Sequence, residues 1–208
     1  MNSKQRVEEA INHRQPDMVP LDLGGSSVTG MSVISVYALR QALQLDPPGT
    51  PVKVIEPFQM LGEVQTDLLD VLGVDVVSLA RRKNMFGYEN TNWKPWFFHN
   101  TPVLVPEKFN TKPEPNGDLY MYPEGDPSVS PSAIMPKGNY YFNSLNRQKP
   151  IEENTLNPAE NMEEFTPISD DDVEYLKLEA KRLTQTTKRA VFANFGGTGF
   201  GYNALVPA

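Results

Sequence analysis

The feature that most constrains the fold is a leucine-rich segment, followed by one glycine and then by a β-branched apolar run. Leucines recur at helical spacing over residues 60–72, which predicts an amphipathic helix. Gly73 stands where a helix C-cap is expected. The next residues, VDVVSLA at positions 74–80, are typical of a buried parallel strand. A helix, a glycine and an apolar strand in this order predict an α/β unit.

Two other segments repeat the order of helix and strand. A predicted helix over residues 3–13 precedes the alternating residues 19–23, and a predicted helix over residues 169–188 precedes the apolar run 190–195. A further amphipathic helix is predicted over residues 31–45. The sequence therefore predicts an α/β fold with three strands, each preceded by a helix.

The middle of the chain differs in composition. Residues 86–167 are rich in proline, glycine, asparagine and aromatic side chains, and no internal repeat is visible. The Asn116-Gly117 pair precedes an alternating run, which predicts a β-hairpin. The segment is too long for a structureless loop in a compact domain. We expect a β-hairpin-rich excursion inserted into a single domain that spans residues 1–208.

Composition excludes several classes of function. The chain has 208 residues, no cysteine and a formal net charge of −7. Without cysteine there is no disulfide, no thiol catalysis and no Cys-ligated zinc within these residues. The acidic balance argues against a nucleic-acid partner. The charged amino-terminal segment has no apolar signal region, and no apolar run reaches the ~20 residues of a membrane span. We expect a cytoplasmic protein without a membrane partner.

Small or polar residues follow each predicted strand, where parallel α/β folds gather their functional groups. Backbone amides in the first cluster could hold an anion, an arginine in the second could clamp a carboxylate, and the third could line a pocket. The alternatives are tight glycine turns and a solvated charge run. The candidate substrate-binding residues are Gly24, Gly25, Ser26, Arg81, Arg82, Asn84, Asn194, Gly196, Gly197 and Thr198.

The glycine-rich stretch at 196–201 is not a nucleotide fingerprint. Its glycines do not fit G-x-G-x-x-G, because Tyr202 stands where the last glycine belongs. No Gly-Lys-Ser/Thr follows, which excludes a Walker A loop. Two interpretations of this stretch remain, a strand-to-helix turn and a loop that contacts a ligand.

Three segments together resemble the uroporphyrinogen decarboxylase superfamily, and most closely its corrinoid-linked methyltransferase-like branch. They are RVEEAINHRQPDMVPLDLGG near the amino terminus, LLDVLGVDVVSLARR in the middle and AVFANFGGTGFGYNALV near the end. The resemblance implies a (β/α)8 TIM barrel. This chain would supply about the first three β/α units, interrupted by the β-rich, proline- and aromatic-rich segment. On that expectation the fragment alone would be inactive.

The chain departs from the decarboxylase pattern at two places. Where the family carries an Arg-Gln-Ala-Gly-Arg loop after the first strand, this sequence has residues 24–27, Gly-Gly-Ser-Ser. Where the family carries an aspartate that stabilises a pyrrole cation, the register gives Arg81 or Arg82. A cation cannot stabilise a cationic intermediate. The resemblance therefore favours corrinoid-dependent methyl transfer.

The same resemblance implies the partners and cofactors. The ligand would be a small molecule or a tetrapyrrole or corrinoid, with a corrinoid protein as partner and a homo-oligomer as a further possibility. No cofactor is expected within this chain, whereas the family's zinc would be held by His and Cys ligands in its C-terminal half. The alternatives are a uroporphyrinogen decarboxylase and a non-catalytic fragment or binding module that retains the fold.

Overall fold

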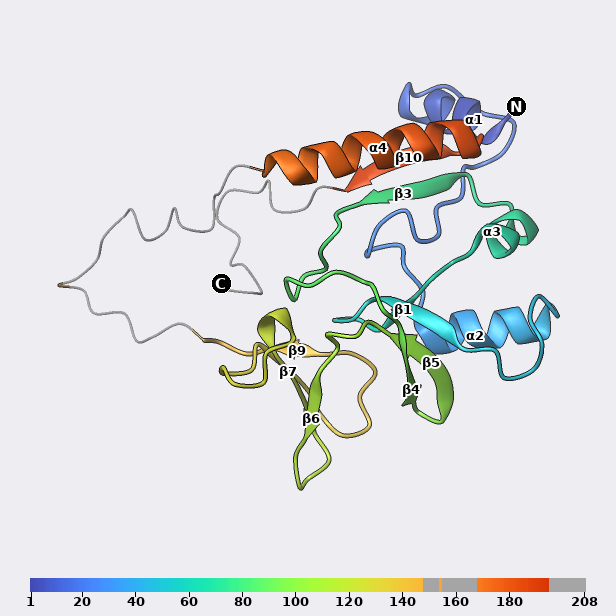
Figure 1. Ribbon diagram of the computed structural model, residues 1–208. Coiled ribbons are helices and arrows are strands. Elements are labelled where there is room, and N and C mark those ends of the chain that lie inside the picture. Colours follow the sequence, from blue (N-terminus) through green and yellow to red (C-terminus); the bar gives the residue numbers. More distant parts are fainter. Residues whose placement is uncertain (148–153, 155–167, 195–208) are drawn as a thin grey trace.

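The computed structural model describes residues 1–147, 154 and 168–194 (Figure 1). Its helices are α1 (Ser3–Ile11), α2 (Val33–Ala42), α3 (Thr66–Leu72), α4 (Asp170–Thr186) and the 3-10 turn η1 (Pro123–Gly125). Its strands are β1 (Val52–Glu56), β2 (Leu61–Gly62), β3 (Val76–Ala80), β4 (Lys94–Phe98), β5 (Thr101–Val105), β6 (Thr111–Pro113), β7 (Leu119–Met121), β8 (Ala133–Met135), β9 (Asn143–Ser144) and β10 (Ala190–Asn194). The described strands form three separate sheets.

The first sheet is a parallel pair made by β3 and β10. Val76 lies opposite Ala190, and the register continues without interruption to Ala80 opposite Asn194. Helix α4 packs on both strands, and α1 contacts β10 (Figure 1). The predicted strands at 74–80 and 190–195 and the predicted helix over 169–188 are confirmed within a few residues.

The second sheet has the strand order β2-β1-β5-β4. Strands β1 and β5 are parallel, whereas β1 with β2 and β4 with β5 are antiparallel. Strands β4 and β5 are joined by His99 and Asn100, both with positive φ, as a two-residue hairpin turn requires. Helix α2 packs against β1, β2 and β5.

The third sheet is an antiparallel meander of β6, β7, β8 and β9. Its first hairpin turns at Asn116-Gly117, where Gly117 has a φ of 92°. Left-handed backbone of this kind is accessible to glycine without steric cost. The β-hairpin predicted from the Asn-Gly pair is therefore confirmed.

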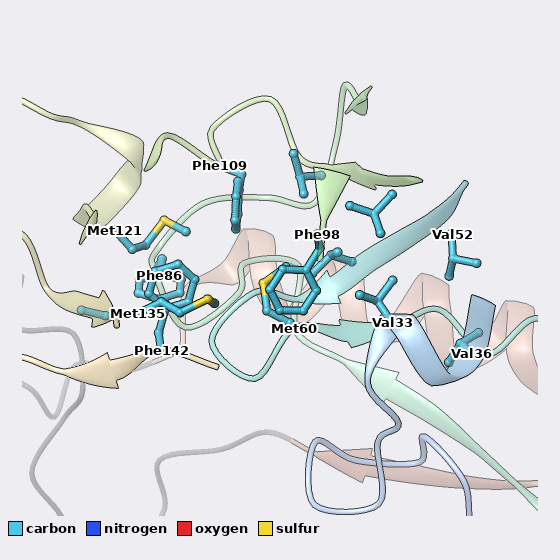
Figure 2. Close-up of a cluster of buried hydrophobic side chains, with 14 of the residues drawn as sticks. Val33, Val36, Val52, Met60, Phe86, Phe98, Phe109, Met121, Met135 and Phe142 are labelled. Carbon is cyan, nitrogen blue, oxygen red and sulfur yellow. The ribbon is translucent and has the colours of Figure 1, made fainter. Parts of the chain in front are cut away.

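One hydrophobic core joins the second and third sheets. Figure 2 shows side chains from α2 and β1 packed with aromatic and methionine side chains from the 86–142 region. Its fully or nearly fully buried members include Val33, Val36, Val54, Met60, Leu68, Phe86, Tyr88, Val103, Phe109, Met121, Met135 and Phe142. The described part of the β-rich excursion thus shares its core with the segments that precede it.

The expectation of a partial TIM barrel is wrong. The described residues form a mixed α/β structure with antiparallel and mixed sheets, and do not form the repeating β/α units of a barrel. The first of the three expected barrel strands, at 19–23, is absent. Val19 is 86% exposed and Leu21 is 45% exposed, so this segment does not bury the apolar side chains of an inner barrel strand.

Local hydrogen bonding explains why residues 19–23 do not form a strand. Pro20 has no amide hydrogen to donate to a neighbouring strand. The amide of Leu21 donates to Asp75 Oδ2 over 3.0 Å. The carboxylate of Asp22 accepts hydrogen bonds from the amide of Gly25 and the hydroxyl of Thr29. These bonds hold the segment as a loop at the beginning of β3.

Candidate functional site

The carboxyl ends of β3 and β10 lie at the same edge of their sheet. Ala80 and Asn194 are directly opposite in the register, so residues that follow β3 begin where β10 ends. Arg81, Arg82 and Asn84 follow β3 and therefore share this edge with the backbone of Asn194. The other third-cluster candidates, Gly196, Gly197 and Thr198, lie outside the described residues.

Arg82 ties the loop after β3 to the first turn of α4. Its Nε lies 3.3 Å from Glu89 Oε1, and its Nη2 lies 3.8 Å from Asp172 Oδ1. The buried Nε atom is within ion-pair distance of Glu89 but makes no hydrogen bond to the described residues. The Arg82 side chain is 36% exposed, so an anionic ligand can reach it only in competition with two carboxylates. Arg81, the other candidate cation, is exposed.

Asn84 connects the loop after β3 to the end of β1. Its Oδ1 accepts a 2.9 Å hydrogen bond from the amide of Phe86, and its Nδ2 donates to Asn90 Oδ1 over 2.9 Å. Asn90 in turn donates from Nδ2 to the carbonyl of Ile55 over 2.6 Å. This chain of amide groups holds the two strand-end loops side by side.

The amides of Gly24, Gly25 and Ser26 donate within their own loop. Gly24 donates to the carbonyl of Thr29 over 2.9 Å, Gly25 to Asp22 Oδ1 over 2.9 Å, and Ser26 to Thr29 Oγ1 over 3.3 Å. A Cβ on Gly25 would lie 2.5 Å from Asp22 Oδ1 and 2.9 Å from a methyl carbon of Val76. The loop is therefore closely packed against the first residue of β3, whereas Arg81 and Arg82 follow the last.

Glu56, at the end of β1, was not among the predicted site residues. Its partly buried carboxylate accepts a 3.1 Å hydrogen bond from the amide of Phe58 at Oε1 and a 2.8 Å bond from the amide of Gln59 at Oε2. Burial raises the pKa of Glu56 above its ordinary value, although both amide hydrogen bonds act in the opposite direction. Glu56 therefore keeps its proton to a higher pH than an exposed glutamate does.

Tyr88 places a second titratable group in the same region. The side chain is 1% exposed, and its hydroxyl lies 3.9 Å from the sulfur of Met121. Burial raises the pKa of the Tyr88 phenol, a hydrogen bond with Asn84 lowers it, and the charge of Glu56 raises it again. The charge of Glu56 is therefore close enough to influence the ionisation of Tyr88.

The sequence carries a weak signal for Glu56. It is an acidic residue that follows the apolar positions of VKVI and precedes Pro57, at the end of a strand. The sequence analysis predicts no strand over residues 52–56, so it does not identify Glu56 as a residue at the end of a strand. Tyr88 carries no signal of its own, because an aromatic residue in an aromatic-rich segment is most simply a core residue.

The described residues do not fit a zinc site. They contain no group of three or more His, Cys, Asp or Glu side chains arranged to hold a metal ion. The chain also has no cysteine and only two histidines.

Among the described helices, none combines the length and the apolar character needed to cross a membrane. Comparison of the chain with models of protein families, with curated proteins and with solved structures found no match.

Proposed function

We propose that this chain is part of an enzyme similar to the uroporphyrinogen decarboxylase superfamily and acts in corrinoid-dependent methyl transfer. The proposal rests on the three segments that carry the resemblance, two of which include β3 and β10. The observation that supports it most directly is the uninterrupted parallel pairing of these two strands. Their carboxyl ends share one edge, and ligand-binding groups of parallel sheets gather at such edges.

The charged residues in the loop after β3 favour methyl transfer over tetrapyrrole decarboxylation. Decarboxylation passes through a pyrrole cation, which needs a carboxylate beside it. In this loop Arg81 and Arg82 bring positive charge, and the carboxylates of Glu89 and Asp172 are already paired with Arg82. The described carboxylates beside Arg82 are therefore engaged by its guanidinium and are not free to stabilise a cationic intermediate.

Arg82 is the residue to which we assign binding of the substrate. Its Nε is buried without a hydrogen bond to the described residues, and its distance to Asp172 is too long for one. An unmade hydrogen bond at a buried charged donor is costly. A carboxylate or phosphate oxygen of the substrate would accept a hydrogen bond from this Nε. That bond would offset the loss of the ion pairs of Arg82 with Glu89 and Asp172, which the substrate would displace.

Methyl transfer from methylcobalamin to a small thiol, measured with the whole enzyme of which this chain is proposed to be a part, tests the proposal. Transfer is followed by the loss of methylcob(III)alamin absorbance, and consumption of uroporphyrinogen is assayed in parallel. We expect methyl transfer without uroporphyrinogen turnover. Arg82→Ala is expected to lower the rate of transfer about tenfold, the effect of losing one hydrogen bond from a charged donor.

Arg182→Ala is the matched control. Arg182 lies on α4 and pairs with Glu179 on the same exposed helix face, so its removal is expected to leave the transfer rate unchanged. Uroporphyrinogen turnover without methyl transfer would replace the proposal with decarboxylation. A rate that is the same for wild type and Arg82→Ala would show that Arg82 does not contact the substrate.

A second candidate is a non-catalytic fragment that retains the fold and does not use this loop to bind a substrate. It is favoured by the way the predicted binding groups are used, since the amides of Gly24, Gly25 and Ser26 all donate within their own loop. Groups engaged in this way stabilise a loop and are not available to a substrate. The absence of both methyl transfer and uroporphyrinogen turnover in the folded protein would favour this candidate.

A further inference from the structure

The turn between β6 and β7 (Figure 1) carries the one Asn-Gly pair of the sequence, Asn116-Gly117. Asparagine is a chemically labile residue in proteins. Asn116 is exposed to solvent, and Gly117 has a φ of 92°. Because glycine has no Cβ, a neighbouring side chain can approach its amide nitrogen with little steric hindrance. This pair is therefore the place in the chain that is most open to attack of the backbone on a side-chain amide.

The reaction at this pair needs only water and hydroxide. The amide nitrogen of Gly117 gives its proton to hydroxide and attacks Asn116 Cγ. The new bond between that nitrogen and Cγ forms as the bond between Cγ and Nδ2 breaks, and Nδ2 takes a proton from water and leaves as ammonia. Water then adds to one of the two carbonyl groups of the cyclic imide and opens the ring. The product is aspartate or isoaspartate, depending on which carbonyl group the water attacks.

Three hydrogen bonds of the turn oppose this attack. Asn116 Nδ2 donates to Asp118 Oδ2 over 2.8 Å, and Asn116 Oδ1 accepts from the amide of Asp118 over 3.0 Å. The amide of Gly117 donates to the carbonyl of Glu114 over 2.8 Å. Ring closure breaks the bond of Gly117 and turns the Asn116 side chain away from Asp118. Each hydrogen bond that must break first slows the reaction about fivefold.

Asp118 also joins this turn to the connection between β8 and β9. Its Oδ1 accepts a hydrogen bond from the amide of Lys137 over 2.8 Å. A Cβ on Gly117 would lie 2.9 Å from Lys137 Cδ, so the two turns are in close contact. One carboxylate therefore holds the reactive side chain through Oδ2 and the neighbouring turn through Oδ1.

We propose that Asn116 is a deamidation site, that Asp118 protects it, and that deamidation releases the β6–β7 turn from Lys137. An aspartate at position 116 has no hydrogen to donate, because a carboxylate is an acceptor only. Asp118 Oδ2 then loses its donor and faces a second negative charge, which repels it. Isoaspartate also carries the main chain through its side-chain carbon, which lengthens the turn. The inference is independent of the proposed function.

Peptide mass spectrometry after incubation at mildly alkaline pH tests the site. The expected result is the mass increase that accompanies exchange of an amino group for a hydroxyl group, at Asn116 before any other asparagine of the folded protein. Isoaspartate is identified in the same peptide by enzymatic methylation of its free α-carboxyl group. Asn116→Gln is expected to lose the modification, because glutamine would have to close a larger ring. A sample unfolded in urea gives the rate without the three hydrogen bonds.

Two variants test the protection by Asp118. Asp118→Ala removes the acceptor of Asn116 Nδ2 and keeps the amide at position 118, so deamidation is expected to be at least about fivefold faster. Asp126→Ala is the matched control, because Asp126 accepts from the amide of Ser128 in the connection between β7 and β8. Its removal is expected to leave the rate at Asn116 unchanged. Circular dichroism checks the folding of both variants.

Hydrogen exchange at the amide of Lys137 measures the release of the turn. Asn116→Asp supplies one product of the reaction in uniform form, and this amide is expected to exchange about fivefold faster in it than in wild type. Unchanged exchange would overturn the release, and equal deamidation rates in wild type and Asp118→Ala would overturn the protection. A folded protein in which another asparagine reacts first would overturn the site itself, as would one whose Asn116 stays intact while the urea-unfolded sample reacts.

Discussion

Arg40 is a charged residue that the fold buries almost completely. It lies on α2, is 3% exposed, and donates to the carboxylates of both Asp46 and Asp67. Asp46 follows α2, and Asp67 lies in the first turn of α3. One guanidinium therefore fixes the end of one helix to the beginning of another, in a geometry that uses its planar donor fork.

Replacing Arg40 with methionine is expected to lower the free energy of unfolding by about 3 kcal/mol at pH 7. Removal of the guanidinium leaves the carboxylates of Asp46 and Asp67 without their cation. Because Asp67 is partly exposed, the loss of stability stays near the lower end of the range for a broken buried ion pair. Urea denaturation measures the change. Arg182→Met, on an exposed helix face, is the control and is expected to change stability by less than about 0.5 kcal/mol.

The same ion pairs give the effect a pH dependence. Hydrogen bonds from Arg40 lower the pKa of Asp46 and of Asp67 below their ordinary values. Carboxylates with a lowered pKa contribute stability above their unfolded pKa, and the contribution is lost as the pH falls through the folded pKa. The difference between wild type and Arg40→Met is therefore expected to shrink below about pH 4. A difference that stays constant between pH 7 and pH 3 would contradict this assignment.

Single residues differ in how well their surroundings can be read from sequence. Ser169 was expected to begin a helix, and it caps α4 by accepting from the amide of Asp172 over 3.1 Å. Capping depends on residues three positions apart, so a sequence window contains both partners. Arg40 and Glu56 were missed because their burial depends on distant segments that fold over them.

Helix α3 ends in the way its sequence indicates. Gly73 is its C-cap, with a φ of 67°, and a Cβ at this position would meet no atom within 4 Å. The left-handed backbone, and not crowding, is therefore what favours glycine here. This turn leads directly into β3.

Gly73→Ala is expected to destabilise the protein by about 1 kcal/mol, because a Cβ strains a left-handed residue. Gly73→Asn should cost less, since asparagine tolerates this conformation better. Thermal or urea unfolding of the two variants checks the order. Equal stability of wild type and Gly73→Ala would mean that the turn relaxes to another conformation.

Elements with strong local signals were predicted better than those that depend on neighbours. The predicted helix over 31–45 is confirmed as α2, although it is shorter. The predicted helix over 60–72 begins only at Thr66, because Leu61 and Gly62 pair with β1 as β2. Helical spacing of leucines could not reveal this pairing, since the partner strand determines the conformation of its first residues.

At the scale of the whole molecule, the sequence predicted apolar strands but not their arrangement. An apolar run can pair with a parallel or with an antiparallel strand, so the run alone does not determine the sheet. The barrel was predicted from the family resemblance, whereas the described residues form three sheets. The pairing of β1 with β5 is a contact between distant segments and has no local signature. For the same reason the edge shared by β3 and β10 was expected in part, whereas the cluster of Glu56 and Tyr88 was not expected at all.

The pairing of β3 with β10 also has a consequence for the order of folding. It closes a loop of about 110 residues, whose closure entropy costs more than that of any short hairpin. The β4–β5 hairpin, by contrast, closes over two residues. Pulse-labelling hydrogen exchange during refolding should therefore protect the amides between β4 and β5 before those between β3 and β10. Simultaneous protection would mean that both strand pairs form in one cooperative step.

If β10 does dock last, the edge that carries Arg82 is completed only at the end of folding, and early intermediates would lack the ability to bind ligand there.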